Sequence, residues 1–236
     1  MFVKNLLNFL FPTFCVWCHA SGDYLCANCK RELKPHPECC PFCHRVSPHY
    51  QTCLDCRVRQ KSVAGIMVTF QYTQTIKKLI LALKYYHKHD VAGFLATRLW
   101  LLLQTNPALQ QAMHEQKLFI SCVPSHRRRR WFVKGYNQSF LLAQAIAGEL
   151  GVPCVTVAKK TSFTRSQTKL SRAQRLINLT GSFTLEEDLV LPPDATVLII
   201  DDITTTGATI VTLSDLLKSK LPGLTVWWAV IGRHGN

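Results

Sequence analysis

Two patterns of hydrophobic and polar positions alternate along most of the chain. Apolar residues spaced three and four apart predict helices at 75–85, 90–103 and 137–150. Short apolar runs predict strands, and these lie at 64–72, 118–123, 154–158, 196–200 and 224–231. We expect Asp90 to cap the second helix, and Gly151 with Pro153 to end the third. The alternation predicts an α/β fold with a mostly parallel sheet flanked by helices.

The first 60 residues differ from this pattern because they contain few large apolar side chains. The whole chain of 236 residues is long enough for one α/β domain and a small appendage. A polar link at 57–62 marks the expected boundary. We therefore predict a small domain at 1–60, which needs bound metal ions to fold, and a larger domain at 61–236.

Cysteines in the N-terminal segment supply candidate metal ligands. Eight of them form four CxxC pairs: Cys15/Cys18, Cys26/Cys29, Cys40/Cys43 and Cys53/Cys56. Two such turns complete a tetrahedral Cys₄ site, so we expect two structural zinc ions. Sequential pairing of the turns is favoured, although interleaved pairing gives a cross-braced alternative. The histidines at 19, 36, 44 and 49 are alternative ligands, but with eight matched thiols we expect them at the surface.

The run VLIIDDITTTGAT at 197–209 carries the most specific chemistry. Its four apolar residues predict a strand buried on both faces, and Asp201 and Asp202 stand at the carboxyl end, where open α/β sheets bind ligands. A threonine-rich loop then opens a helix, whose N-terminus favours an anion. Paired carboxylates suit the hydroxyls of a ribose, and the loop suits its 5′-phosphate. The loop candidates are Thr204, Thr205, Thr206, Gly207, Ala208 and Thr209. Two merely solvated aspartates would leave the threonines around Gly207 unexplained.

A second informative segment follows the strand at 118–123 and is strongly basic. Its candidate anion-binding residues are Pro124, Ser125, Arg127, Arg128, Arg130 and Lys134. Such a loop neutralises a phosphate or pyrophosphate, whereas the alternatives are a solvated basic face or a localisation signal. The polar, basic stretch 166–183 lacks an apolar period, which suits a mobile loop over the phosphates or a plain surface helix.

The net charge of +14 is concentrated in the middle of the chain. Residues 125–180 contain eleven basic residues and one acidic residue. This concentration indicates polyanionic partners, either nucleic acid or pyrophosphate or both. The apolar N-terminal stretch lacks a small-residue cleavage site, so we expect a short docking helix rather than a signal peptide, with a membrane-surface anchor as the alternative. We expect no transmembrane segment and a cytoplasmic protein.

The run 197–209 resembles the phosphoribosyl-pyrophosphate (PRPP) motif of type I phosphoribosyltransferases. Over essentially its whole length the chain resembles the ComF family of competence proteins, including GntX-like members. The matching features are the four CxxC pairs, the aromatic-then-helix segment at 72–85, Val123–Pro124, the Gly–Tyr–Asn–Gln start at 135–138, the pattern from Gln167 to Phe183, and the PRPP loop. The resemblance implies a double zinc ribbon in front of a type I phosphoribosyltransferase-like domain.

The resemblance also implies roles. Asp201 and Asp202 would hold the 2′- and 3′-hydroxyls of PRPP, the loop at 204–209 would hold its 5′-phosphate, and magnesium would bridge ribose and pyrophosphate oxygens. The basic loop would take the pyrophosphate, but it is one residue longer than the family pattern, so the arginine that makes this contact stays open.

The family further implies a part in DNA uptake during natural transformation, with single-stranded DNA as ligand and competence-machinery proteins as partners. The alternative is an active magnesium-dependent phosphoribosyltransferase that transfers phosphoribose from PRPP to an unidentified acceptor in nucleotide metabolism. The sequence leaves open whether the protein is an enzyme.

Overall fold

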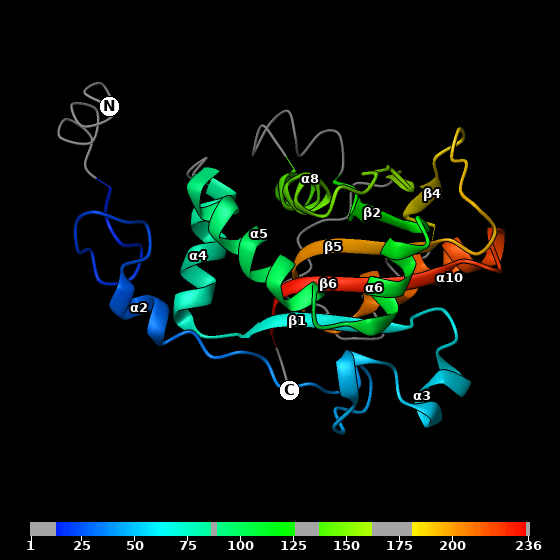
Figure 1. Cartoon of the computed structure of the whole chain (residues 1–236), viewed down its shortest axis with the longest axis horizontal. Helices are drawn as coiled ribbons and strands as arrows, with labels where there is room; N and C mark the ends of the chain where they lie inside the picture. Colours follow the sequence, from blue (N-terminus) through cyan, green and yellow to red (C-terminus); the bar gives the residue numbers. More distant parts are fainter. Residues whose placement is uncertain (1–12, 86–88, 126–136, 162–180, 235–236) are drawn as a thin grey trace.

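The structure, a computed structural model, describes residues 13–85, 89–125, 137–161 and 181–234 (Figure 1). Its elements, in chain order, are α2 (Ala27–Arg31), η1 (Pro48–Tyr50), α3 (Leu54–Arg59), β1 (Gly65–Gln71), α4 (Gln74–Tyr85), α5 (His89–Leu103), α6 (Pro107–His114), β2 (Leu118–Cys122), α8 (Gln138–Leu150), β3 (Ala158–Lys160), β4 (Phe183–Leu185), β5 (Thr196–Thr204), α10 (Ala208–Lys220) and β6 (Thr225–Arg233). The predicted docking helix at the N-terminus lies outside the described residues.

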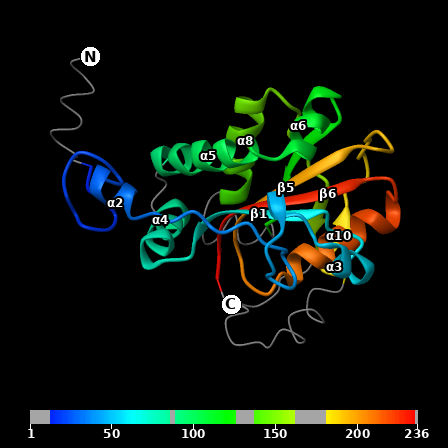
Figure 2. The same cartoon turned by 60° about the horizontal axis from the view of Figure 1, so that its bottom comes forward.

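A four-stranded sheet in the order β1-β6-β5-β2 forms the centre of the molecule, and each neighbouring pair of strands is parallel. Helices α5, α6 and α8 cover one face, and α10 covers the other (Figures 1 and 2). Because both faces are covered, the two central strands are buried over most of their length. The predicted α/β class is confirmed.

Helix α10 is attached to the sheet by a buried aromatic contact. The side chain of Trp228 on β6 is fully buried, and its Nε1 donates to Ser214 Oγ on α10 at 2.8 Å. Burying a large apolar side chain contributes about 1.5–3 kcal/mol, and the hydrogen bond satisfies the only polar atom of the indole. This contact fixes the helix whose N-terminus faces the candidate site.

Several predicted elements differ in detail. The strand predicted at 154–158 is only an isolated bridge between Ile120 and Cys154. The chain then leaves the main sheet, and β3 pairs antiparallel with β4. The predicted link at 57–62 is in part the last turn of α3, and Asp90 lies inside α5 instead of capping it. Helix α6 was not predicted, although Asn106 caps it through its side-chain oxygen.

The cysteine-rich segment runs along the outer edge of β1. Isolated antiparallel bridges join Pro35 to Phe70 and Gln51 to Gly65, near the two ends of that strand. At the far end of β6, Arg233 Nη2 donates to the carbonyl oxygen of Pro41 at 2.8 Å. The segment therefore covers a strand edge that would otherwise be exposed for unwanted pairing. Its independent folding as a domain of residues 1–60 stays a prediction.

Candidate functional site

The two aspartates lie on β5 at a point where its neighbour β2 has ended and its other neighbour β6 continues. The strand β5 does not stop at Ile200, as expected, but continues to Thr204 because β6 pairs with it over that length. On the other side, β2 pairs only as far as Ile200. Asp201 and Asp202 therefore stand beyond the end of β2 while the backbone is still held by β6. Asp201 is half-buried and Asp202 is buried.

The carboxylate of Asp201 is held in a fixed orientation. Ser139 Oγ donates to Asp201 Oδ1 at 2.8 Å, and the backbone N–H of Asp202 donates to the same oxygen at 2.9 Å. Ser139 lies in the first turn of α8, and sequence reasoning missed it. The Asn137 side chain anchors the start of this helix, since its Nδ2 donates to the carbonyl oxygen of Val123 at 3.1 Å.

The threonine-rich segment turns the chain from β5 into α10. Gly207 has a φ of 73°, in the left-handed region, and directly precedes the helix. Thr205 is exposed, and Thr206 and Thr209 are partly exposed, so these hydroxyls lie beside a helix end whose first N–H groups have no intrahelical acceptor. Thr204 is buried as a strand residue.

Two of the residues predicted in the basic loop are described. Pro124 and Ser125 follow β2 at the edge of the sheet where β5 carries its aspartates. The Ser125 hydroxyl is buried and has no hydrogen-bond partner among the described residues, so it has an unmet donor at this end of the sheet. Arg127, Arg128, Arg130 and Lys134 lie outside the described residues, as do residues 166–180 of the predicted phosphate-covering stretch 166–183; its last residue, Phe183, begins β4.

The eight cysteines gather into two sets of four. Cys15, Cys18, Cys26 and Cys29 form one, and Cys40, Cys43, Cys53 and Cys56 form the other, with the sulfurs of each set within 4.8 Å of one another. The preferred sequential pairing is thereby confirmed. The sulfurs of Cys18 and Cys26 are 3.6 Å apart, as are those of Cys43 and Cys53. Tetrahedral zinc–sulfur bonds of about 2.3 Å place sulfurs about 3.8 Å apart, so both sets have suitable dimensions for zinc.

The two sets are built alike. In each, the first cysteine pair lies on a tight turn, and a histidine with a φ of 62° follows it, His19 in one and His44 in the other. The second pair begins at the N-cap of a short helix, α2 or α3. Within the described part of the chain, no histidine belongs to either set. His19 and His44 thus take the left-handed position after each turn, while the candidate metal ligands of both sets are thiols.

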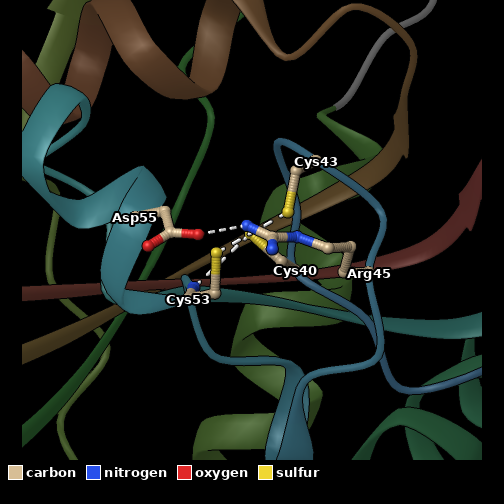
Figure 3. A network of polar contacts seen from close by, with 5 residues as sticks. All are labelled: Cys40, Cys43, Arg45, Cys53 and Asp55. Atoms are coloured by element: carbon tan, nitrogen blue, oxygen red, sulfur yellow. Dashed lines mark hydrogen bonds and ion pairs between the residues drawn. The ribbon is translucent and has the colours of Figure 1, made fainter.

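An arginine and an aspartate lie beside the cysteines of the second set (Figure 3). The Arg45 side chain hydrogen-bonds to the Cys43 sulfur and lowers the pKa of that thiol to about 6, and the same guanidinium pairs with Asp55. In contrast, burial together with the neighbouring sulfurs raises the pKa of Cys56 to about 12. One thiol thus ionises readily and another does not, so a divalent cation is needed for all four to become thiolates.

The first set shows the same division. Burial opposes ionisation of Cys15, but backbone N–H groups of Cys18, Cys26 and Trp17 outweigh it and lower the pKa of Cys15 to about 6. Burial and the three neighbouring sulfurs raise the pKa of Cys29. The donor chemistry of both sets therefore fits zinc, and four thiolates leave no open position for a substrate.

Comparison with known proteins identifies the family. The chain is 28% identical over 233 residues to Competence protein F of Haemophilus influenzae, which covers 95% of this chain and 98% of that protein. It is 30% identical over 224 residues to DNA utilization protein YhgH of Escherichia coli K12, covering 92% of this chain and 96% of the relative. The chain belongs to the ComF family. In this ComF protein, the model of the phosphoribosyl transferase domain family matches residues 137–231, from the start of α8 into β6.

Solved structures of adenine phosphoribosyltransferases are more distant. One is 17% identical with a TM-score of 0.31, covering 56% of this chain and 74% of that chain. The enzyme from Saccharomyces cerevisiae is 18% identical with a TM-score of 0.31, covering 56% and 73%. The fold assignment rests on the parallel sheet and the family model. Within the described ranges, no helix has the length and apolar character that a membrane span requires.

Proposed function

We propose that this ComF protein binds PRPP, or a related ribose phosphate, and takes part in DNA uptake as a single-stranded DNA-binding protein. One observation supports PRPP binding: an oriented carboxylate lies a few residues before a helix N-terminus. Ser139 fixes Asp201 at the end of β5, and Gly207 turns the chain so that α10 begins a few residues later. Both features lie inside the part of the chain that matches the phosphoribosyl transferase family.

Each part of this site has a chemical counterpart in PRPP. Asp201 and Asp202 accept hydrogen bonds from the 2′- and 3′-hydroxyls. The N–H groups of Gly207, Ala208 and Thr209, with the hydroxyls of Thr205, Thr206 and Thr209, hold the 5′-phosphate at the helix end. When bound with PRPP, magnesium would neutralise part of the ligand's negative charge.

The pyrophosphate is assigned to the loop after β2. Ser125 offers a hydroxyl donor there, and Arg127, Arg128, Arg130 and Lys134 add positive charge by sequence. Charge-assisted hydrogen bonds from arginine to phosphate are among the stronger polar contacts in proteins. The two halves of PRPP would thus meet different strand ends at one edge of the sheet.

The DNA half of the proposal is supported by charge and by the relatives. The concentration of eleven basic residues in 125–180 also contains Trp131, Phe132 and Tyr136, which suit base stacking. The similar proteins carry the names Competence protein F and DNA utilization protein. We propose that competence-machinery proteins are further partners and that the protein acts in the cytoplasm.

We further propose that the two cysteine sets are structural zinc sites. Zinc would hold α2 and α3 in place, because each helix begins at a ligand cysteine. The proposed catalytic and binding residues would then lie on the larger domain, and the zinc ions would support folding of the segment beside β1.

Isothermal titration with magnesium-PRPP tests the ligand. Asp201→Asn keeps the shape of the side chain but removes its charge, and it should weaken binding at least about tenfold, the expected cost of a hydrogen bond to a charged group. Asp215→Asn on the exposed side of α10 is the matched control and should bind like the wild type. Equal affinity of all three proteins would refute the site.

Salt-dependent binding of a fluorescent single strand tests the DNA half. Charge reversal at Arg128 and Arg129 should weaken binding and flatten its salt dependence. Reversal at Lys220, an exposed residue at the end of α10, provides the control. Unchanged affinity after reversal at Arg128 and Arg129 would remove the basic loop from the interface.

A second candidate function, phosphoribosyl transfer, is favoured by the family model over 137–231. On this proposal the site would displace pyrophosphate from C1′ of PRPP, by orienting the ribose and stabilising the leaving group. A screen of acceptors for pyrophosphate release, with and without single-stranded DNA, tests it. Acceptor-dependent release supports catalysis, while its absence for every acceptor argues against it and leaves PRPP binding unaffected.

A further inference from the structure

A second pocket opens at the opposite end of the sheet from Asp201. It has a volume of about 310 Å³ and lies where β1 and β6 begin, between the second cysteine set and α10. Its lining consists of Gln51, Arg57, Lys61, Ser62, Val63, Ala64, Ala108, Lys218, Thr225, Val226 and Trp227. Asp201 pairs with Val230, five positions further along β6 than Thr225, which is about 17 Å at 3.3 Å per residue. The pocket is therefore separate from the proposed PRPP site.

All charged side chains that line this pocket are cationic. Arg57 comes from α3, Lys61 from the turn that follows it, and Lys218 from α10, so three separate segments each contribute a cation. The lining residues include no acid, and none of the three cations forms an ion pair with a described carboxylate. Their described hydrogen bonds go to neutral oxygens, from Arg57 Nη2 to Gln51 at 3.4 Å and from Lys218 Nζ to the carbonyl of Pro222 at 3.0 Å.

A buried hydroxyl adds an independent indication of a ligand. Ser62 is 5% exposed, and its Oγ has no hydrogen-bond partner among the described residues although it lines the pocket. A buried polar atom without a partner costs about 1–3 kcal/mol, so an acceptor that reached this hydroxyl would remove that cost. Burial also lowers the pKa of Lys218, as expected for an ammonium group that lacks a neighbouring acid.

Apolar side chains make up much of the remaining lining, with Gln51 and Thr225 as its further polar residues. The apolar residues are Val63, Ala64, Ala108, Val226 and Trp227. A pocket of this size whose lining combines cations with apolar side chains matches a small ligand that carries an anionic group and a flatter, less polar body. A bare inorganic ion would use only the cations.

We propose that this pocket binds a small phosphate monoester of mononucleotide size, with its phosphate on Arg57, Lys61, Lys218 and the Ser62 hydroxyl. The phosphate would provide the acceptor that Ser62 lacks and the negative charge that the three cations lack. Since Arg57 directly follows Cys56, the second cysteine set positions one of the three cations. The proposal is independent of PRPP binding at the other end of the sheet.

The test is isothermal titration of the full-length, zinc-loaded protein with 2′,3′-dideoxyadenosine 5′-monophosphate, which lacks the two ribose hydroxyls assigned to Asp201 and Asp202. We expect saturable binding with one ligand in this pocket, and about tenfold weaker binding in Arg57→Gln, Lys218→Gln and Ser62→Ala, the order of a hydrogen bond to a charged group. Arg59→Gln on α3 and Lys220→Gln on α10 are the matched controls, because each lies two residues from a lining cation and outside the lining. Both controls should bind within about twofold of the wild type, since neither side chain lines the pocket.

Further titrations separate binding in this pocket from binding elsewhere on the chain. 2′,3′-Dideoxyadenosine should not bind, and Asp201→Asn should bind the dideoxynucleotide like the wild type. A short 5′-phosphorylated oligonucleotide that competes with the nucleotide would assign the monoester to a DNA end, and failure to compete would assign it to a free nucleotide. Loss of binding in the controls as large as in the pocket variants would overturn the proposal in favour of general attraction to a basic chain. Loss in Asp201→Asn alone would also overturn it, as would no saturable binding to a wild type whose zinc content and thermal unfolding are normal.

Discussion

Removal of the Ser139 hydroxyl tests whether the orientation of Asp201 matters for ligand binding. Ser139→Ala deletes the donor at 2.8 Å from Asp201 Oδ1 and leaves the backbone N–H of Asp202 as the other described donor to that oxygen. Ser139 is buried, and alanine fits the space that serine leaves. The carboxylate then loses one of the two described contacts that fix its rotamer before PRPP arrives.

The expected magnitude follows from the type of hydrogen bond. A bond to a charged group contributes about 1.5–3 kcal/mol. Asp201 is only half-buried, so water recovers part of this energy and we expect about 1–2 kcal/mol in the affinity for PRPP, or roughly 5–30-fold in Kd.

The assay is titration of magnesium-PRPP into wild type, Ser139→Ala and Ser139→Thr. Threonine restores a hydroxyl and should recover most of the affinity. Loss of this hydrogen bond should lower the thermal unfolding midpoint of Ser139→Ala by a few degrees, so the titrations are run well below that midpoint, where both variants are folded. A Kd in Ser139→Ala equal to that of the wild type would refute the idea that Ser139 prepares Asp201. A loss that threonine does not recover would assign the effect to packing.

Three further predictions concern the loop, the second cysteine set and the packing of α6. Gly207→Ala should destabilise the protein by about 1 kcal/mol or more, because alanine is strained at positive φ. It should also weaken PRPP binding. Since the space around the Gly207 Cα is open, a loss of stability would report backbone strain and not a clash. Calorimetric unfolding and titration measure both effects, and unchanged values would contradict the left-handed turn. Arg45→Gln should raise the pH at which zinc is released from the second set, since Arg45 lowers the pKa of Cys43 to about 6 from an ordinary value of 9.0. Stability from this thiolate is present above pH 9 and is lost as the pH falls through about 6. A chromogenic chelator followed from pH 8 to pH 5, with Arg59→Gln as control, measures the shift, and identical release curves would argue against the contact. Asn106→Ala should cost about 1–2 kcal/mol of unfolding free energy, because the side chain caps α6 and also donates to the carbonyl of His49 at 3.0 Å. Denaturant unfolding measures this cost, and a change below about 0.5 kcal/mol would contradict it.

The local features of the site were predictable from sequence because each depends on neighbouring residues. The position of Asp201 and Asp202 after a buried apolar run, and the glycine that opens the next helix, are visible within 13 residues at 197–209. The sequential grouping of the cysteines likewise follows from short spacing, and the structure has it.

What the sequence did not reveal depends on contacts between distant segments. Ser139 and Asp201 are 62 residues apart in the sequence, and no local sequence pattern predicts their contact. The extension of β5 to Thr204 is set by pairing with β6, whose register the sequence of β5 does not contain. The strand expected at 154–158 was wrong for the same reason, because only one bridge to β2 forms before the chain turns to β4. Helix α6 did have a local signal, the capping residue Asn106 followed by proline.

A crystal structure of the protein grown with magnesium and PRPP is the most direct test of the proposed ligand site. We expect electron density for the ribose hydroxyls against the carboxylates of Asp201 and Asp202, and density for the 5′-phosphate at the N-terminus of α10 beside Gly207. A structure in which PRPP binds elsewhere, while this end of the sheet contains only solvent, would contradict the proposal.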